Sequence, residues 1–411
     1  MYKQRDLEKT LLESLDNRRI SIILGPRQTG KTSLLKRLKA IINYQGIFLD
    51  LDIYENKSIF SSYSELITYL KFNGYNEKDR FILYLDEFHT VEGIDKILKN
   101  IYDNHSNIKI FATGSSSLEI VSYLKESLAG RKTIYYLYPL SFEEFVYFKD
   151  EDLGKRFRSM PGSSIPKTVK LELNNYVKEF CIFGGYPEVV LTQTPESKKE
   201  VLRDIFDLFV KKDLLGFLKI KNPQAALNIL RSLAINAGGI INYSELCTIN
   251  HVDINTLKRY LNILSETFII ELIRPYYSNK NKEVVKSPKA YFYDPGARNY
   301  FIKNFAGFES RVDNSFLIEN FVFCQLIKKS DFLTQIKYWR DKNRREVDFI
   351  VEREMKIMAY EVKYKKIIKK RELSNLLYFH EIYNNSQLII VNQDDPKLAV
   401  EGLNYAAYFE I

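Results

Sequence analysis

The sequence predicts an α/β protein whose N-terminal part is a doubly wound parallel sheet with helices on both faces. Apolar runs alternate with segments of helical periodicity over residues 1–150, and they lie near 20–24, 46–50, 81–85, 108–112 and 133–137. A glycine-rich stretch follows the first run, and two adjacent carboxylates follow the third. Because the carboxyl ends of parallel strands meet at one edge of a sheet, we expect these polar groups to share a site there.

The glycine-rich stretch is a complete Walker A loop between an apolar strand and a helix-forming segment. It reads Gly25, Pro26, Arg27, Gln28, Thr29, Gly30, Lys31 and Thr32. Glycines allow backbone angles that let successive N–H groups point at phosphates, and the positive end of the next helix adds to the attraction. We expect Lys31 to reach the β- and γ-phosphates of ATP and Thr32 to ligate Mg²⁺. The alternative is a glycine turn that binds no ligand.

The third apolar run delivers Asp86 and Glu87 at its carboxyl end. Asp86 is expected to hold Mg²⁺ through water, and Glu87 is the natural general base for the attacking water. Taken alone, two acids after an apolar run indicate only a solvated strand end. Together with the Walker A loop they indicate hydrolysis of the nucleotide.

Two later segments add candidates for the same site. The run from Lys109 ends in small polar residues, of which Thr113 or Ser115 could sense the γ-phosphate; a helix-capping serine is the competing interpretation. Arg131 precedes the fifth strand and is our candidate arginine finger, a charge set against the negative charge that develops in phosphoryl transfer. A solvated surface arginine is the alternative.

Composition narrows the class of protein. A chain of 411 residues is too long for one compact core, so two to four domains are expected. No apolar run is long enough to cross a bilayer, and the first residues lack the apolar core of a signal peptide. The three cysteines, Cys181, Cys247 and Cys324, lie far apart and show no zinc-site spacing. We therefore expect a cytoplasmic protein with no membrane partner.

Residues 221–300 carry the pattern of a winged helix. Helical segments beginning near Pro223, Tyr243 and Asp253 precede two apolar strands, Ile269 to Pro275 and Lys289 to Asp294. Thr256, Lys258 and Arg259 would lie where a recognition helix meets DNA. Winged helices also serve as protein–protein spacers, which is the competing interpretation. The polar stretch Lys149 to Lys167, further upstream, is expected to be a loop or a domain boundary.

The last part of the chain holds a second constellation. Asp348 and Glu361 lie on consecutive strands and could stand side by side, and Glu319, from an apolar helix, could complete a metal site with them. Two such carboxylates bind a hard cation, Mg²⁺ or Mn²⁺, and Lys363 on the same strand face can orient a metal-activated water. The alternative is a cross-strand salt bridge of Asp348 or Glu361 with Lys363.

Two basic runs make DNA a candidate partner, although a net charge of +9 over the whole chain is a weak indication by itself. One run comprises Lys363, Lys365, Lys366, Lys369, Lys370 and Arg371. The other comprises Lys280, Lys282, Lys286 and Lys289. Each run could equally be a solvated face.

The motifs in combination resemble those of prokaryotic AAA+-related ATPases, close to the archaeal ATPase and signal-transduction NTPase (STAND) group, that carry a C-terminal domain of unknown function similar to PD-(D/E)xK nucleases. The resemblance rests on the Walker A loop, Leu-Asp-Glu ending at Glu87, Thr-Gly-Ser-Ser from Thr113, Leu-Ala-Gly-Arg ending at Arg131, Tyr-Pro-Leu-Ser-Phe from Tyr138, Gly-Gly-Tyr-Pro from Gly184, Glu-Asn-Phe from Glu319, Arg-Glu-Val-Asp ending at Asp348 and Glu-Val-Lys ending at Lys363. Val347 replaces the proline of the nuclease motif.

This resemblance implies a P-loop ATPase core (1–150), a helical lid (151–220), a winged helix (221–300) and a nuclease-like α/β domain (301–411). Two functions follow as expectations. The first is Mg²⁺-dependent ATP hydrolysis coupled to DNA handling, with Asp348, Glu361 and Lys363 supporting cleavage with a second Mg²⁺ or Mn²⁺. The second is an ATP-regulated switch acting on a protein partner, either as a homo-oligomer or with another chain, in which the nuclease-like domain only binds.

Overall fold

The computed structural model describes residues 2–115, 128–160, 165–211, 214, 222–277, 283, 286–393, 395 and 402–411. The chain divides into two compact units, Met1–Tyr138 and Pro139–Ile411. This division falls earlier than the expected boundary at residue 150. The reason is that Phe142 and Phe145 of helix α7 (Phe142–Lys149) pack among Phe180 and Phe321 of the second unit. The finer division into four domains stays a prediction.

The described part of the first unit contains a parallel five-stranded sheet in the order β2-β3-β4-β1-β5. Its strands are β1 (Ile20–Gly25), β2 (Gln45–Asp50), β3 (Phe81–Asp86), β4 (Ile108–Ser115) and β5 (Lys132–Tyr136). All five expected strands are confirmed, as is their parallel direction. Strands β1 and β3 are buried along their whole length, as expected for a sheet covered on both faces.

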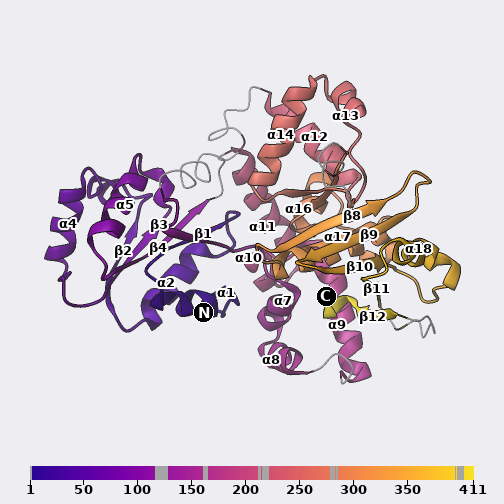
Figure 1. Cartoon of the computed structure of the whole chain (residues 1–411), viewed down its shortest axis with the longest axis horizontal. Coiled ribbons are helices and arrows are strands. Elements are labelled where there is room, and N and C mark those ends of the chain that lie inside the picture. The colour runs from indigo at the N-terminus through magenta and orange to yellow at the C-terminus, as the bar shows by residue number, and fades with distance from the viewer. Residues whose placement is uncertain are drawn as a thin grey trace. The chain divides into compact units, whose positions relative to one another are not determined.

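Helices cover both faces of this sheet. They are α1 (Leu7–Glu13), α2 (Lys31–Ile41), α3 (Tyr54–Ser58), α4 (Tyr63–Phe72) and α5 (Ile94–Asn104), with short 3-10 turns at Ser14–Asp16 and Phe88–Thr90. Leu83 of β3 packs with α4 and α5, whereas the next residue, Tyr84, packs with α1 and α2. Since successive side chains of a strand point to opposite faces, the helices lie on both sides and the doubly wound prediction is confirmed. Figure 1 shows β1 to β4 side by side with helices flanking them.

The second unit begins with helices and a small hairpin. The helices are α7 (Phe142–Lys149), α8 (Glu151–Ser159), α9 (Lys167–Phe183), α10 (Pro187–Leu191), α11 (Pro195–Leu208), α12 (Pro223–Ile235), α13 (Tyr243–Asn250), α14 (Ile254–Glu266) and α16 (Pro295–Ile302). Strands β6 (Ile270–Ile273) and β7 (Lys289–Phe292) pair antiparallel. Helices α12 to α14 followed by this hairpin give the element order of a winged helix, and the assignment itself stays a prediction.

One expectation for this region was wrong, and one local signal was right. The first part of the stretch after Lys149 is not a loop, because helix α8 occupies Glu151–Ser159 and Asp150 caps it by accepting a hydrogen bond from the Leu153 N–H. Helix α14 begins next to Asp253, as expected, and Asp253 caps it by accepting a hydrogen bond from the Thr256 N–H at 3.0 Å. The Thr256 hydroxyl also donates to Asp253, at 2.6 Å, so this side chain is engaged in the cap.

The last part of the second unit is a mixed five-stranded sheet in the order β12-β11-β10-β9-β8 among the described residues. Its elements are α17 (Asn314–Lys329), β8 (Thr334–Arg340), β9 (Glu346–Arg353), β10 (Lys356–Val362), α18 (Ser374–Ile382), β11 (Ser386–Asn392) and β12 (Leu403–Ala407), with 3-10 turns at Phe308–Ser310, Lys370–Leu373 and Tyr408–Glu410. Strands β8, β9 and β10 pair antiparallel, and β10, β11 and β12 pair parallel.

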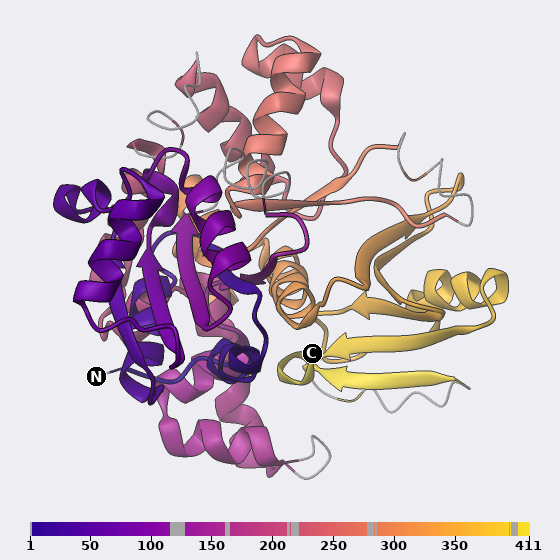
Figure 2. The ribbon, with the colours of Figure 1, turned by 60° about the vertical axis from the view of Figure 1, so that its left-hand side comes forward.

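The two helices of this part cover opposite faces of its sheet. Ala359 of β10 packs with α18, whereas the next residue, Tyr360, packs with α17. Figure 2 shows the orange-to-yellow strands of this sheet with α18, in yellow, lying against them. The sheet therefore carries two hydrophobic cores, and polar side chains on its central strands are buried unless they reach a strand end.

Candidate nucleotide site and C-terminal carboxylate cluster

The backbone of the Walker A loop requires its two glycines. A Cβ on Gly25 would lie 2.2 Å from the Leu137 carbonyl oxygen, closer than any side chain permits. Gly30 caps helix α2 with φ at 93°, in the left-handed region, and Gln28 also has a positive φ of 59°. The loop therefore curls tightly from the end of β1 into the first turn of α2, the form in which backbone N–H groups can face an anion.

Lys31 is buried and folds back over this loop. Its Nζ donates to the carbonyl oxygen of Gly25 at 2.9 Å and to that of Pro26 at 2.7 Å. The Thr29 hydroxyl donates to the same Pro26 oxygen at 3.0 Å. The ammonium group is thus held at the loop, and Thr32 follows it as the second residue of α2.

Arg5 anchors the loop from the N-terminal segment, a role that the sequence analysis missed. Its side chain is buried, and its two terminal nitrogens donate to the carbonyl oxygens of Thr29, at 2.7 Å, and Tyr138, at 2.9 Å. Nothing in the local sequence marks Arg5, because its partners lie far along the chain.

The carboxyl ends of β3 and β4 bring Asp86 and Thr113 together. Leu85 pairs with Ala112, so Asp86 comes beside Thr113, and both are buried. The Thr113 hydroxyl donates to the Asp86 carboxylate and accepts from the Glu87 N–H at 3.2 Å. Of the two residues expected to sense the phosphate, Thr113 therefore contacts the acidic pair, whereas the side chain of Ser115 lies outside the described part.

The Glu87 carboxylate is influenced by the charge of Lys31 and lies close to His89. Burial raises the pKa of its carboxyl group; the Lys31 charge opposes this rise, and the Asp86 charge adds to it. His89 Nδ1 lies 3.3 Å from Glu87 Oε2, and burial, reinforced by the positive charge of Arg27, lowers the pKa of His89 to about 4. His89 is therefore neutral near pH 7. Glu87 also has φ at 49°, a strained conformation of the kind that concentrates at functional sites.

Arg131 lies away from the phosphate loop of its own chain. It precedes β5, whose first residue, Lys132, pairs with the first residue of β1. Arg131 therefore lies near the amino ends of these strands, whereas Gly25 lies at the carboxyl end of β1. Its guanidinium makes a two-point ion pair with Asp103, at 2.8 Å and 3.1 Å. A finger role therefore requires a second copy of the chain, and it stays a prediction.

The C-terminal carboxylates come together as the strand pattern predicted. Tyr360 pairs with Phe349, which sets Glu361 opposite Asp348. The Val362 N–H donates to Asp348 Oδ2 at 2.8 Å, and Lys363 Nζ donates to Glu361 Oε1 at 2.5 Å. The ion pair of Glu361 with Lys363 that we considered as an alternative is thus present, but it joins residues two positions apart on one segment and does not cross between strands.

Glu319 is held by two residues of the hairpin strand β7. The Tyr291 hydroxyl donates to Glu319 Oε1 at 2.5 Å, and Lys289 Nζ lies 3.7 Å from the same oxygen. Lys289 is only 2% exposed and lies 2.6 Å from Glu346 Oε1. The expectation that Lys289 belongs to an exposed basic run was therefore wrong. Its neighbours Lys280 and Lys282 lie outside the described residues.

These acids form a carboxylate cluster, defined as Glu319, Glu346, Asp348 and Glu361, and burial affects the titration of three of them. It raises the pKa of Glu319, Asp348 and Glu361, and the negative charge of Asp348 adds to the rise for Glu319 and Glu361. Within the described ranges no three His, Cys, Asp or Glu side chains are arranged to hold a metal ion. The side chains of this cluster, as they stand, do not fit a metal, and the metal roles of Glu319, Asp348 and Glu361 stay predictions.

The other basic run is exposed. It follows β10 and comprises Lys365, Lys366, Lys369, Lys370 and Arg371, interrupted by the buried Ile368. Lys365 pairs with one carboxylate oxygen of Glu372, and the second oxygen accepts from the Lys369 backbone N–H at 2.9 Å. The segment therefore has a defined backbone that presents its cations outward.

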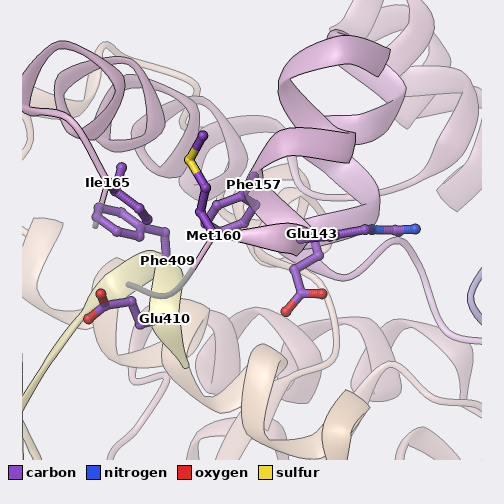
Figure 3. Close-up of a pocket in the computed structure, with 7 residues that line it drawn as sticks. Glu143, Phe157, Met160, Ile165, Phe409 and Glu410 are labelled. Atoms are coloured by element: carbon purple, nitrogen blue, oxygen red, sulfur yellow. The ribbon is translucent and has the colours of Figure 1, made fainter. Parts of the chain in front are cut away.

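A pocket elsewhere in the second unit contains none of the predicted site residues. It is lined by Glu143, Phe157, Arg158, Met160, Ile165, Phe409 and Glu410. Figure 3 shows the apolar side chains around it, with the two carboxylates on either side. It borders residues 161–164, which lie outside the described part, and we assign it no role.

Family models match three successive parts of the chain. Residues 17–146 match an AAA domain, residues 174–307 a domain of unknown function (DUF8612), and residues 314–409 another domain of unknown function (DUF4143). With the parallel sheet and the phosphate loop, the first match identifies an AAA-type P-loop domain. The four acids of the carboxylate cluster all lie in the third matched region, whereas their partners Lys289 and Tyr291 lie in the second.

Relatives extend over almost the whole chain. An uncharacterized protein of Methanocaldococcus jannaschii is 28% identical, with 97% of this chain and 88% of the relative covered. An uncharacterized protein of Haemophilus influenzae is 26% identical, with 98% and 96% covered. These relatives support a shared arrangement of regions and add nothing about activity.

Solved structures resemble the chain more distantly. The Walker-type ATPase PABY2304 of Pyrococcus abyssi gives a TM-score of 0.48 at 18% identity, covering 73% of this chain and 96% of that one. Cdc6p of Pyrobaculum aerophilum gives 0.32 at 15% identity, covering 74% and 95%. Likenesses of this size carry no conclusion about function.

None of the helices in the described ranges combines the length and apolar character that crossing a bilayer requires.

Proposed function

We propose that the first unit binds ATP and hydrolyses it with Mg²⁺. The observation that carries this proposal is that Lys31, held at the end of β1, and the acids Asp86 and Glu87, at the end of β3, lie on either side of β4. Lys31 and Asp86 are both within electrostatic reach of the Glu87 carboxylate. A phosphate-holding lysine beside a metal-binding acid and a second acid is the set that hydrolysis of a nucleotide needs. The match to an AAA domain supports the same activity.

Each residue has a distinct part in this proposal. The N–H groups of the loop and Lys31 hold the β- and γ-phosphates, while Thr32 and Asp86 are the residues that would hold the metal. Mg²⁺, when bound, offsets the charge of the phosphates. Glu87 takes the proton of the attacking water, a task that its raised pKa favours because the proton is then accepted more readily near neutral pH. The Thr113 hydroxyl keeps the acidic pair in place.

Purified protein tests this function directly. We expect it to release phosphate from ATP with Mg²⁺ and to lose this activity with EDTA. The Lys31→Ala variant should bind no nucleotide, whereas Lys36→Ala, an exposed position on the same helix, should behave as the wild type. Phosphate release by Lys31→Ala at the wild-type rate would contradict the proposal.

For the second unit we propose a binding role coupled to the nucleotide state. Two partners were expected, DNA and a protein, and the exposed run Lys365 to Arg371 favours DNA, since outward-facing lysines neutralise phosphates without reading sequence. Incubation with duplex DNA, ATP and Mn²⁺ tests the role. Cleavage that Asp348→Ala abolishes would establish a nuclease, whereas ATP hydrolysis indifferent to DNA would favour a protein partner.

A further inference from the structure

The carboxylate cluster contains more negative than positive charge. Its four acids, Glu319, Glu346, Asp348 and Glu361, face three cations, namely Lys289, Lys363 and Arg340, whose guanidinium lies 3.5 Å from Glu346 Oε2. Glu361 is 6% exposed, and within the described residues its Oε2 atom is buried without a hydrogen-bond partner. Buried acids of this kind require a cation or a proton.

Lys289 reaches the cluster from outside the sheet that carries it. It lies on strand β7, whereas the acids lie on α17, β9 and β10. Its Nζ lies 2.6 Å from Glu346 Oε1 and 3.7 Å from Glu319 Oε1, and its charge also acts on Asp348. The ring of Tyr338, with its centroid 5.4 Å from Nζ, lies beside the ammonium group.

The position of β7 is well defined by other contacts. Tyr291, two residues further on the same strand face, donates to Glu319, and the side chain of Asn320 bonds both backbone groups of Phe292, at 2.8 Å and 3.0 Å. Lys289 is therefore delivered to the acids by a strand fixed in register against α17.

We propose that the Lys289 ammonium occupies the place of a divalent cation among these acids, and that the cluster is a latent metal site which Lys289 keeps closed. A metal ion and an ammonium group compete for the same carboxylate oxygens, and the lysine has the advantage of being attached to the chain. Removing it leaves Glu319, Glu346 and Asp348 without that counterion, so hard oxygen ligands become available to Mg²⁺ or Mn²⁺. This inference concerns the second unit and does not depend on ATP hydrolysis.

Mn²⁺ binding to the full-length protein without nucleotide tests this inference, followed by electron paramagnetic resonance of the free ion. We expect Lys289→Met to gain one Mn²⁺ site, at least tenfold tighter than any site the wild type has at the cluster, and the double variant Lys289→Met/Asp348→Asn to lose it. Lys289→Arg, which keeps the charge, and Lys286→Met, which changes an exposed lysine nearby, should resemble the wild type.

Thermal unfolding supplies a second readout, because Lys289→Met removes one partner of a buried ion pair and is expected to be less stable. Mn²⁺ should then raise the melting temperature of Lys289→Met and leave that of Lys289→Arg unchanged. A folded Lys289→Met protein that binds no Mn²⁺ would overturn the proposal. So would Mn²⁺ binding by the wild type that Asp348→Asn abolishes, a result that stands even if Lys289→Met does not fold.

Discussion

The hydroxyl of Thr113 donates a hydrogen bond to the carboxylate of Asp86 and at the same time accepts one from the Glu87 backbone N–H, at 3.2 Å. One side chain at the end of β4 thereby fixes both acids at the end of β3. Because Asp86 and Thr113 are buried, this contact is shielded from water, and the positions of the proposed metal ligand and base depend on it.

Thr113→Val should therefore lower the turnover of ATP at least tenfold while nucleotide affinity changes little. The substitution keeps the shape but removes the hydroxyl, which costs roughly 1.5–3 kcal/mol for a hydrogen bond to a charged group. Steady-state phosphate release and a titration with a fluorescent ATP analogue separate the two effects. Thr113→Ser, which retains the hydroxyl, is the control, and equal turnover by the Val and Ser variants would refute the role.

Arg131 can act only across an interface between two copies of the chain. In its own chain it lies near the amino ends of β1 and β5, away from the phosphate loop, and is paired there with Asp103. If it is a finger, Arg131→Ala should lower turnover by roughly 10³-fold with little change in affinity. Mixing this variant with Glu87→Gln protein should restore part of the activity through mixed interfaces. Wild-type turnover by Arg131→Ala, or full activity from a demonstrably monomeric enzyme, would exclude the role.

Local patterns predicted the five strands, both nucleotide motifs and the pairing of Asp348 with Glu361, since each depends on residues close in sequence or on one hairpin. They did not predict Arg5 at the phosphate loop or Lys289 among the acids. These side chains meet partners more than twenty positions away, for example Thr29 and Glu346, and their burial follows from packing that no local pattern encodes. Lys289 was misassigned because its run of lysines suggested an exposed face.

The exposed lysines after β10 should supply nonspecific affinity for DNA. Replacing four of them with glutamine should weaken binding and flatten its dependence on salt, by up to about 0.9 in the logarithmic slope for each DNA phosphate that the protein no longer neutralises. The four are Lys365, Lys366, Lys369 and Lys370.

Anisotropy titrations of duplex DNA at two salt concentrations measure this slope. A matched variant replaces four exposed lysines elsewhere, namely Lys9, Lys71, Lys155 and Lys199. The same slope in both variants would identify the run after β10 as a solvated face. Both variants should hydrolyse ATP without DNA at the wild-type rate.

The cluster should make the stability of the C-terminal sheet depend on pH. Burial and the neighbouring Asp348 charge raise the folded-state pKa of Glu361 above its ordinary value of 4.5, so the folded state holds a proton that the unfolded state releases. The contribution of Glu361 to the free energy of unfolding is therefore complete below pH 4.5, and it is lost as the pH rises through the raised pKa of the folded state. The free energy of unfolding should therefore fall between about pH 5 and pH 8, and less so in Glu361→Gln.

Trp339, the single tryptophan of the chain, is buried in β8 and reports unfolding of this sheet through its fluorescence. Urea titrations at several pH values, with the exposed Glu381→Gln as a control, give the comparison. A pH dependence that Glu361→Gln leaves unchanged would show that other groups cause it.

The comparison of Glu87→Gln with Lys31→Ala tests the proposed ATPase site most directly. Both variants are titrated with radiolabelled ATP and Mg²⁺, and a single turnover is then followed. We predict that Glu87→Gln binds ATP as the wild type does and fails to hydrolyse it, because only the proton acceptor is missing, whereas Lys31→Ala does not bind. Equal loss of binding in the two variants, or hydrolysis by Glu87→Gln at the wild-type rate, would contradict the assignment of Glu87 as the base.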